Sequence, residues 1–192
     1  NAKTYRKKLF KLSKESNFQV VFNSKYTENL GHSIYYGMES IIENPVEISR
    51  INYTNVSVGI NAFHCVGWRK NKGSAIIRAL ALSFPNKEFF IYGNDLISTG
   101  AEFPNIVFVG FKNDWIEKLS ARDLVLVPSL VPETFSRVTA EALIHSKQIL
   151  ASSVGNIPYL LKDYPNRLVL NPCDINEWIE KILHLDECSL HN

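Results

Sequence analysis

Residues 128–155 read PSLVPETFSRVTAEALIHSKQILASSVG, a stretch that contains two glutamates, Glu133 and Glu141, with seven residues between them. An apolar segment at 123–127 precedes it and predicts a buried strand. Pro132 cannot extend a strand ladder, so we expect the strand to end before it. An amphipathic helix is expected next, which leaves Glu133 on the loop entering the helix and Glu141 about two turns further along it.

The start of this expected helix has the properties of an anion site. Thr134 or Ser136 can cap it, and its first backbone N–H groups lie without partners at the positive end of the helix dipole. Amides of this kind suit a phosphate group, and carboxylates on either side suit hydroxyl groups. The residues therefore favour a nucleotide sugar as the ligand.

The same stretch resembles the E-x7-E region of the retaining glycosyltransferases of family 4, which have the two-domain GT-B fold. Three further segments are similar to motifs of that family and follow its order along the chain: Cys65-Val-Gly-Trp-Arg-Lys-Asn-Lys-Gly73, Phe89-Phe-Ile-Tyr-Gly-Asn94 and Asn105-Ile-Val-Phe-Val-Gly-Phe111. Four motifs in order over roughly 61–158 make a specific signal, although each alone would be weak.

The resemblance assigns roles to individual residues. It implies that Arg69 and Lys72 stabilise the leaving diphosphate, that Glu133 orients the donor sugar, and that Glu141 binds the ribose hydroxyls. It also implies a set of donor-binding residues: Gly67, Gly93, Asn94, Thr134, Phe135, Ser136 and Arg137. Phe111, directly after Gly110, either borders the base of the donor or is a core residue. Ser136 stands where many relatives have glycine, and we expect its side chain to narrow the pocket.

The pattern along the chain predicts an α/β fold, a Rossmann-like parallel sheet with helices on both faces, which the resemblance identifies as one half of a GT-B fold. The expected strands are 61–66, 88–92, 105–109, 123–127, 148–152 and 167–170, and the expected helices are 73–84, 113–120, 134–146, 156–163 and 174–185. Gly67, Gly93, Gly110 and the PETF turn all fall at the carboxyl ends of strands, where open parallel sheets bind ligands. His64 lies in a buried strand, where we expect a satisfied core residue.

Composition narrows the class of protein. The 192 residues suffice for one domain, 1–192, and a net charge of +2 is too small to indicate a nucleic-acid partner. No apolar run approaches the roughly 20 residues needed to cross a bilayer. The three cysteines have no metal-binding spacing, and we expect a cytoplasmic protein. An Asp-x-Asp motif is missing, which suits a GT-B enzyme that needs no metal.

The resemblance also concerns the parts before residue 61. It implies that 1–45 form the interdomain crossing and the first elements of the donor domain, and that a complete enzyme carries an acceptor domain ahead of them that these residues do not include. Before the sheet we expect a basic helix at 3–16, a strand at 18–22, a helix at 24–35 and a strand at 40–43. The basic segment 3–14 either meets an anionic membrane or packs on the acceptor domain through Tyr5, Leu9 and Leu12.

The function that follows is the donor-binding domain of a retaining glycosyltransferase, which transfers a hexosyl group from a UDP- or GDP-sugar to a glycan or lipid-linked acceptor in polysaccharide biosynthesis. Alone, the chain is expected to be inactive in transfer. A non-catalytic nucleotide-sugar-binding subunit that needs a partner chain is one alternative. A nucleotide-sugar epimerase with the GT-B fold is another, although the E-x7-E turn argues against it.

Overall fold

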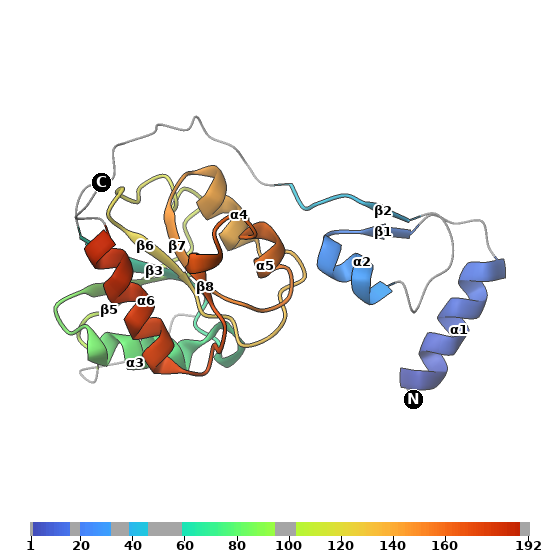
Figure 1. The fold of residues 1–192 in the computed structure, drawn as a ribbon, viewed down its shortest axis with the longest axis horizontal. Coiled ribbons are helices and arrows are strands. Elements are labelled where there is room, and N and C mark those ends of the chain that lie inside the picture. Colours follow the sequence, from blue (N-terminus) through green and yellow to red (C-terminus); the bar gives the residue numbers. More distant parts are fainter. Residues whose placement is uncertain (1, 16–19, 32–38, 46–58, 95–102, 189–192) are drawn as a thin grey trace.

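The computed structural model describes residues 2–15, 20–31, 39–45, 59–94 and 103–188. A six-stranded parallel sheet with the order β5-β4-β3-β6-β7-β8 forms its centre (Figure 1). The strands are β3 (Ala62–Val66), β4 (Glu88–Tyr92), β5 (Ile106–Gly110), β6 (Leu124–Val127), β7 (Gln148–Ser152) and β8 (Leu168–Val169). All four residues of β6 are buried, as a strand covered on both faces requires. The expected parallel sheet is confirmed.

Helices cover both faces of this sheet. On one face, α3 (Ser74–Ser83) and α6 (Ile175–Cys188) bury Ile77, Leu80 and Trp178 against Phe63 of β3. On the other, α4 (Arg137–Ile144) and α5 (Ile157–Leu160) pack on β6 and β7. Two short 3₁₀ turns, η1 (Lys70–Lys72) and η3 (Pro165–Arg167), lie in the connections. The sheet with its two apolar layers is therefore the Rossmann-like half that the pattern predicts.

The prediction of a helix at 113–120 is wrong, because residues 113–118 form turns. Trp115, Ile116 and Leu119 are each buried against the sheet. Burial of these side chains against the sheet therefore decides the course of the segment and overrides its helical period.

Two other helices are shorter than expected. α4 begins at Arg137 and not at 134, because Ser136 has a left-handed backbone with φ of 67°. α5 ends at Leu160 and not at 163. Every other strand and helix expected from residue 61 onward is present, with bounds that differ by a few residues.

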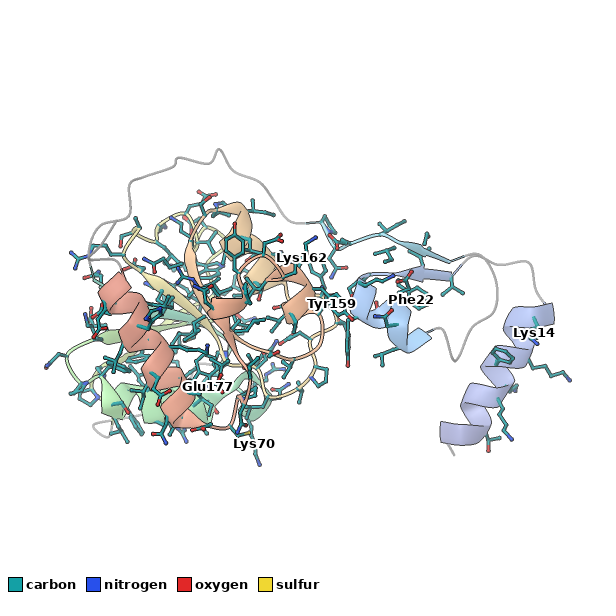
Figure 2. All side chains as sticks on the ribbon, viewed as in Figure 1. Lys14, Phe22, Lys70, Tyr159, Lys162 and Glu177 are labelled. Atoms are coloured by element: carbon teal, nitrogen blue, oxygen red, sulfur yellow. The ribbon has the colours of Figure 1, made fainter. Side chains whose placement is uncertain are left out.

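The elements before the sheet are α1 (Ala2–Glu15), β1 (Val20–Phe22), α2 (Lys25–Gly31) and β2 (Glu39–Ile41), and β1 pairs with β2 in parallel. These agree with the expected elements, except that residues 16, 18–19 and 32–35 of the expected ranges lie outside the described residues. α1 lies apart from the other elements, whereas α2 adjoins α5 (Figure 1). Tyr159 projects from α5 toward α2 (Figure 2), and its hydroxyl accepts a 2.9 Å hydrogen bond from Asn29.

None of the helices in the described ranges combines the length and the apolar composition that a bilayer crossing requires.

Candidate functional site

Three glycines mark the carboxyl edge of the sheet, where ligands bind in open parallel sheets. Gly67 and Gly93 follow β3 and β4, Gly110 ends β5, and all three have positive φ angles of 87°, 131° and 81°. The Gly67 N–H donates to the Tyr92 carbonyl at 2.8 Å, and the Gly93 N–H donates to the Gly110 carbonyl at 3.1 Å. Neighbouring strand ends are thus joined by backbone hydrogen bonds. Because glycine has no side chain, these residues do not fill the space above the strand ends.

A close backbone contact brings Lys72 to the exit of β6. Gly73 has a φ of 78°, and a Cβ atom there would lie 2.0 Å from the Pro128 carbonyl oxygen, so only glycine fits. The Leu130 N–H donates to the Asn71 carbonyl at 2.9 Å. The turn at 70–73 and the loop after β6 are therefore fixed against each other, although they are far apart in the chain.

Lys72 and Glu133 meet across this contact. The Lys72 Nζ atom lies 2.5 Å from Glu133 Oε1, and the Ser129 hydroxyl donates to the same oxygen at 2.6 Å. The Glu133 side chain is 17% exposed and that of Lys72 is 38% exposed. A carboxylate removed this far from water needs such partners. Lysine and glutamate, predicted to act on one ligand, are indeed neighbours and neutralise each other here.

The Glu133 loop is also fixed from the side of β7. Gly155 has a φ of 59°, and a Cβ atom there would lie 2.3 Å from the Glu133 carbonyl oxygen. Asn156, which is 1% exposed, donates its N–H to that oxygen at 2.8 Å and its side-chain amide to the Phe135 carbonyl at 3.2 Å. The Ser24 hydroxyl donates to the Thr134 carbonyl. The loop thus has contacts from three separate parts of the chain.

Ser136 behaves differently from the expected cap. It stands at the N-cap position of α4, but its side chain makes no capping bond to the backbone, and Oγ instead lies 2.8 Å from the Thr139 hydroxyl. Thr134 lies two residues before this position and does not cap the helix either. Ser136 therefore adopts a backbone conformation that favours glycine, with its hydroxyl satisfied by α4 itself.

Two adjoining cavities lie along this edge. The first, of about 270 Å³, is called the Glu133 cavity, and its lining includes Lys72, Ser129, Glu133, Thr134, Phe135 and Ser136. The second, of about 340 Å³, is called the Glu141 cavity, and its lining includes Tyr92, Gly93, Phe111, Asn113, Trp115 and Glu141. Val66, Arg137 and Val138 line both. The two cavities therefore lie side by side at this edge and share part of their lining.

Glu141 has a looser environment than Glu133. Its Oε1 atom lies 3.2 Å from the Arg137 guanidinium one turn earlier on α4, and the Arg137 side chain is 67% exposed. An exposed pair of this type contributes little to stability. The Glu141 carboxylate, itself 19% exposed, can therefore exchange this partner for a hydroxyl group at small cost.

Most of the predicted site residues come together, and a few do not. Lys72, Glu133 and Glu141, with the residues from Thr134 to Arg137, Gly93 and Phe111, line one cavity or the other. Gly67 lies next to the Lys72 side chain. Arg69 and Asn94 are exposed and line neither cavity.

The sequence-based prediction missed several lining residues. Ser129, Tyr92 and Trp115 line the cavities but were not predicted. Ser129 and Tyr92 directly adjoin predicted strand ends, a position that could have identified them. Trp115 had no such signal, since its segment was predicted to be a helix.

In the described part of the chain, no group of three or more His, Cys, Asp or Glu side chains is arranged to bind a metal ion.

Comparisons with known proteins agree with this geometry. A family model described as "Glycosyl transferases group 1" matches residues 62–187. A comparison with curated protein sequences gives no match.

Solved structures share the fold over nearly the whole chain. Anabaena HepE, solved with UDP and glucose, superposes with a TM-score of 0.74 and 21% identity, covering 99% of this chain and 59% of its own. A Rickettsia africae glycosyltransferase has a TM-score of 0.72 and 16% identity, covering 98% and 58%. TarM has a TM-score of 0.70 and 17% identity, covering 96% and 39%. The chain thus spans 39% to 60% of the length of such structures.

The parallel sheet, its glycine-lined carboxyl edge and the family match over residues 62–187 together give the classification. The chain belongs to the group 1 glycosyltransferases and has the Rossmann-like fold of one half of a GT-B enzyme.

Proposed function

We propose that this chain binds the nucleotide-sugar donor of a retaining glycosyltransferase, with the diphosphate and sugar in the Glu133 cavity and the nucleoside in the Glu141 cavity. The observation that carries the proposal is that the two cavities adjoin, with Lys72 and Glu133 lining one and Glu141 lining the other. A donor has the same order of groups: sugar, two phosphates, ribose and base.

At the Glu133 cavity the diphosphate takes Lys72 as its partner. Two cations, Lys72 and Arg137, line this cavity. Both can neutralise the negative charge that develops on the diphosphate as the sugar departs. Glu133, released from Lys72, then accepts hydrogen bonds from sugar hydroxyls while Ser129 keeps its orientation. Arg69 lies outside the cavity and would have to move to assist.

At the Glu141 cavity the nucleoside binds through a carboxylate and aromatic rings. Glu141 accepts from the ribose hydroxyls, and the rings of Phe111, Tyr92 and Trp115 lie along the part of the cavity that receives the base. Aromatic faces stack on any base and discriminate little between them. Both UDP- and GDP-sugars therefore remain candidate donors.

The full transfer reaction requires an acceptor, a glycan or a lipid-linked glycan, presented by a second domain facing the same edge. A second domain there would exclude water, and without one a bound donor would be hydrolysed slowly and not transferred. The enzyme that we propose is cytoplasmic, acts in polysaccharide biosynthesis and works without a metal cofactor.

Calorimetry with UDP and GDP tests the proposal. We expect both nucleotides to bind with and without EDTA, and Lys72→Ala to weaken UDP much more than uridine, because the lysine contacts phosphate. Lys70→Ala is the matched control, since Lys70 is exposed and projects away from the body of the chain (Figure 2). Strict dependence on magnesium or manganese, or equal losses for UDP and uridine, would contradict the proposal.

A non-catalytic subunit that binds the donor for a partner chain is a second candidate. Co-purification of a separate acceptor-domain protein would support it.

A further inference from the structure

A row of buried polar side chains lies behind the Glu141 cavity. It runs from Asp123, before β6, through His64 on β3 to Tyr92 at the end of β4. Asp123 is 6% exposed and His64 is 5% exposed, whereas Tyr92 is half-buried and lines the cavity. His64 is therefore more than the satisfied core residue expected from the sequence, because it connects a buried charge to the cavity wall.

Two contacts join the three side chains of this row. Asp123 Oδ2 lies 3.4 Å from His64 Nε2, and Tyr92 Oη lies 3.0 Å from His64 Nδ1. Burial would raise the pKa of Asp123, but the neighbouring His64 imidazole and a hydrogen bond from the Ser120 backbone N–H outweigh it and lower that pKa to about 2. The Asp123 carboxylate faces Nε2 without closing a hydrogen bond, and its charge favours the tautomer with the proton on Nε2, in which Nδ1 accepts from the Tyr92 hydroxyl.

Tyr92 is fixed at both its hydroxyl and its ring. The imidazole of His64 stacks on the Tyr92 ring, with centroids 5.8 Å apart and planes at 20°, and on the Phe90 ring at 5.1 Å. Trp115 contacts Tyr92 at 5.2 Å between ring centroids. With its hydroxyl bound inside the protein, Tyr92 contributes its ring to the cavity.

We propose that His64 is a positioning residue for the Glu141 cavity: it fixes the Tyr92 hydroxyl so that the Tyr92 ring, which contacts the tilted Trp115 ring, forms part of an aromatic wall for the nucleobase. The inference rests on the proposed function, because the wall matters only if a nucleoside binds there. His64 itself does not touch the ligand. Its effect on binding passes through the Tyr92 ring.

The alternative, a purely structural role, predicts different behaviour. Loss of His64 should destabilise the fold whatever its role, because Asp123 would keep a buried charge without its neighbour. If His64 acts only in folding, its variants should change the free energy of unfolding. Their effect on nucleotide binding should then not depend on whether the Tyr92 contact is kept. If it positions Tyr92, variants that lose the Tyr92 contact should weaken nucleotide binding in the same way as loss of the hydroxyl.

Two substitutions of His64 separate these roles. Asparagine reaches the position of Nδ1 and can accept from Tyr92, whereas glutamine reaches the position of Nε2 and retains only the Asp123 side. We expect His64→Gln and Tyr92→Phe each to weaken UDP binding roughly two- to tenfold, the net value of one hydrogen bond. His64→Asn should retain most of the affinity. Tyr159→Phe, which removes a tyrosine hydroxyl contact outside the two cavities, is the matched control and should bind UDP normally.

A double-mutant cycle gives the decisive result. His64→Gln combined with Tyr92→Phe should bind UDP no more weakly than either single variant, because both remove the same contact. Lys72→Ala combined with Tyr92→Phe should show additive losses. Additive losses in the first pair, or equal affinities of the asparagine and glutamine variants, would overturn the inference. If the unaltered chain binds neither UDP nor GDP, the proposed function itself fails, which distinguishes the two failures.

Discussion

The Glu133 cavity and the Glu141 cavity meet at Arg137, yet different kinds of contact keep them in shape. Around the first, backbones touch: Gly73 lies against Pro128 and Gly155 against Glu133, with no room for a Cβ atom. Behind the second, side chains form the support, from Asp123 through His64 to Tyr92. The first cavity is thus sensitive to added atoms, and the second to lost hydrogen bonds and to protons.

The largest expected effect concerns the backbone contacts. Gly155→Ala should lower the free energy of unfolding by roughly 2–5 kcal/mol, since the new methyl overlaps the Glu133 backbone and the residue keeps a left-handed φ. Gly110→Ala is the control, because its φ is also positive but no atom lies within 4 Å of the added Cβ. It should lose only about 1–2 kcal/mol. Urea denaturation measures both, and equal losses would show that the Glu133 loop is not tightly packed.

An intermediate effect is expected when the side chains behind the Glu141 cavity, from Asp123 through His64 to Tyr92, are acidified. The pKa of Asp123 is lowered to about 2, so its contribution to stability is complete above its ordinary pKa near 4 and is lost as the pH falls through 2. The contribution should be ~2 kcal/mol. Urea denaturation of the unaltered chain and of Asp123→Asn, from pH 7 to pH 2, checks this. The difference in the free energy of unfolding between the two proteins should shrink below pH 4. A constant difference would show that the lowered pKa of Asp123 does not stabilise the fold.

The smallest expected effect tests the charge pair. Because Lys72 is paired with Glu133, Glu133→Gln removes a competitor for the diphosphate and should tighten UDP binding by at most about fivefold, which corresponds to the roughly 0.2–1 kcal/mol of a partly exposed ion pair. The same variant should weaken a UDP-sugar, which loses its carboxylate partner. Glu141→Gln is the contrast and should weaken both ligands. Weaker UDP binding by Glu133→Gln would mean that the pair supports the site and does not compete with the ligand.

The sequence was sufficient for features that depend on local signals. Apolar strands, glycines at their ends and the PETF turn placed Lys72, Glu133 and Glu141 at one edge, because the carboxyl ends of parallel strands meet there. The lysine and the first glutamate are 61 residues apart and still contact each other.

Features that depend on contacts between distant segments could not be predicted. His64 is 28 residues from Tyr92, and no local pattern indicates that an imidazole and a hydroxyl will meet. The turns at 113–118 result from burial of Trp115 and Ile116, which outweighs a helical periodicity. The left-handed backbone of Ser136 has no signal in the serine itself, and only the glycine of relatives at this position points to it.

The position of β6 beside β3 determines when the site can form during folding. β3, β4 and β5 follow one another in the chain and are neighbours in the sheet, whereas β6 must return to the far side of β3 after β5 is complete. Pairing of this long range is slow, because loop closure costs entropy before new contacts offset it. A chain emerging from the ribosome would therefore display the glycine edge well before Glu133 arrives beside Lys72. A donor that spans both cavities would select the fully assembled sheet and stabilise it by mass action.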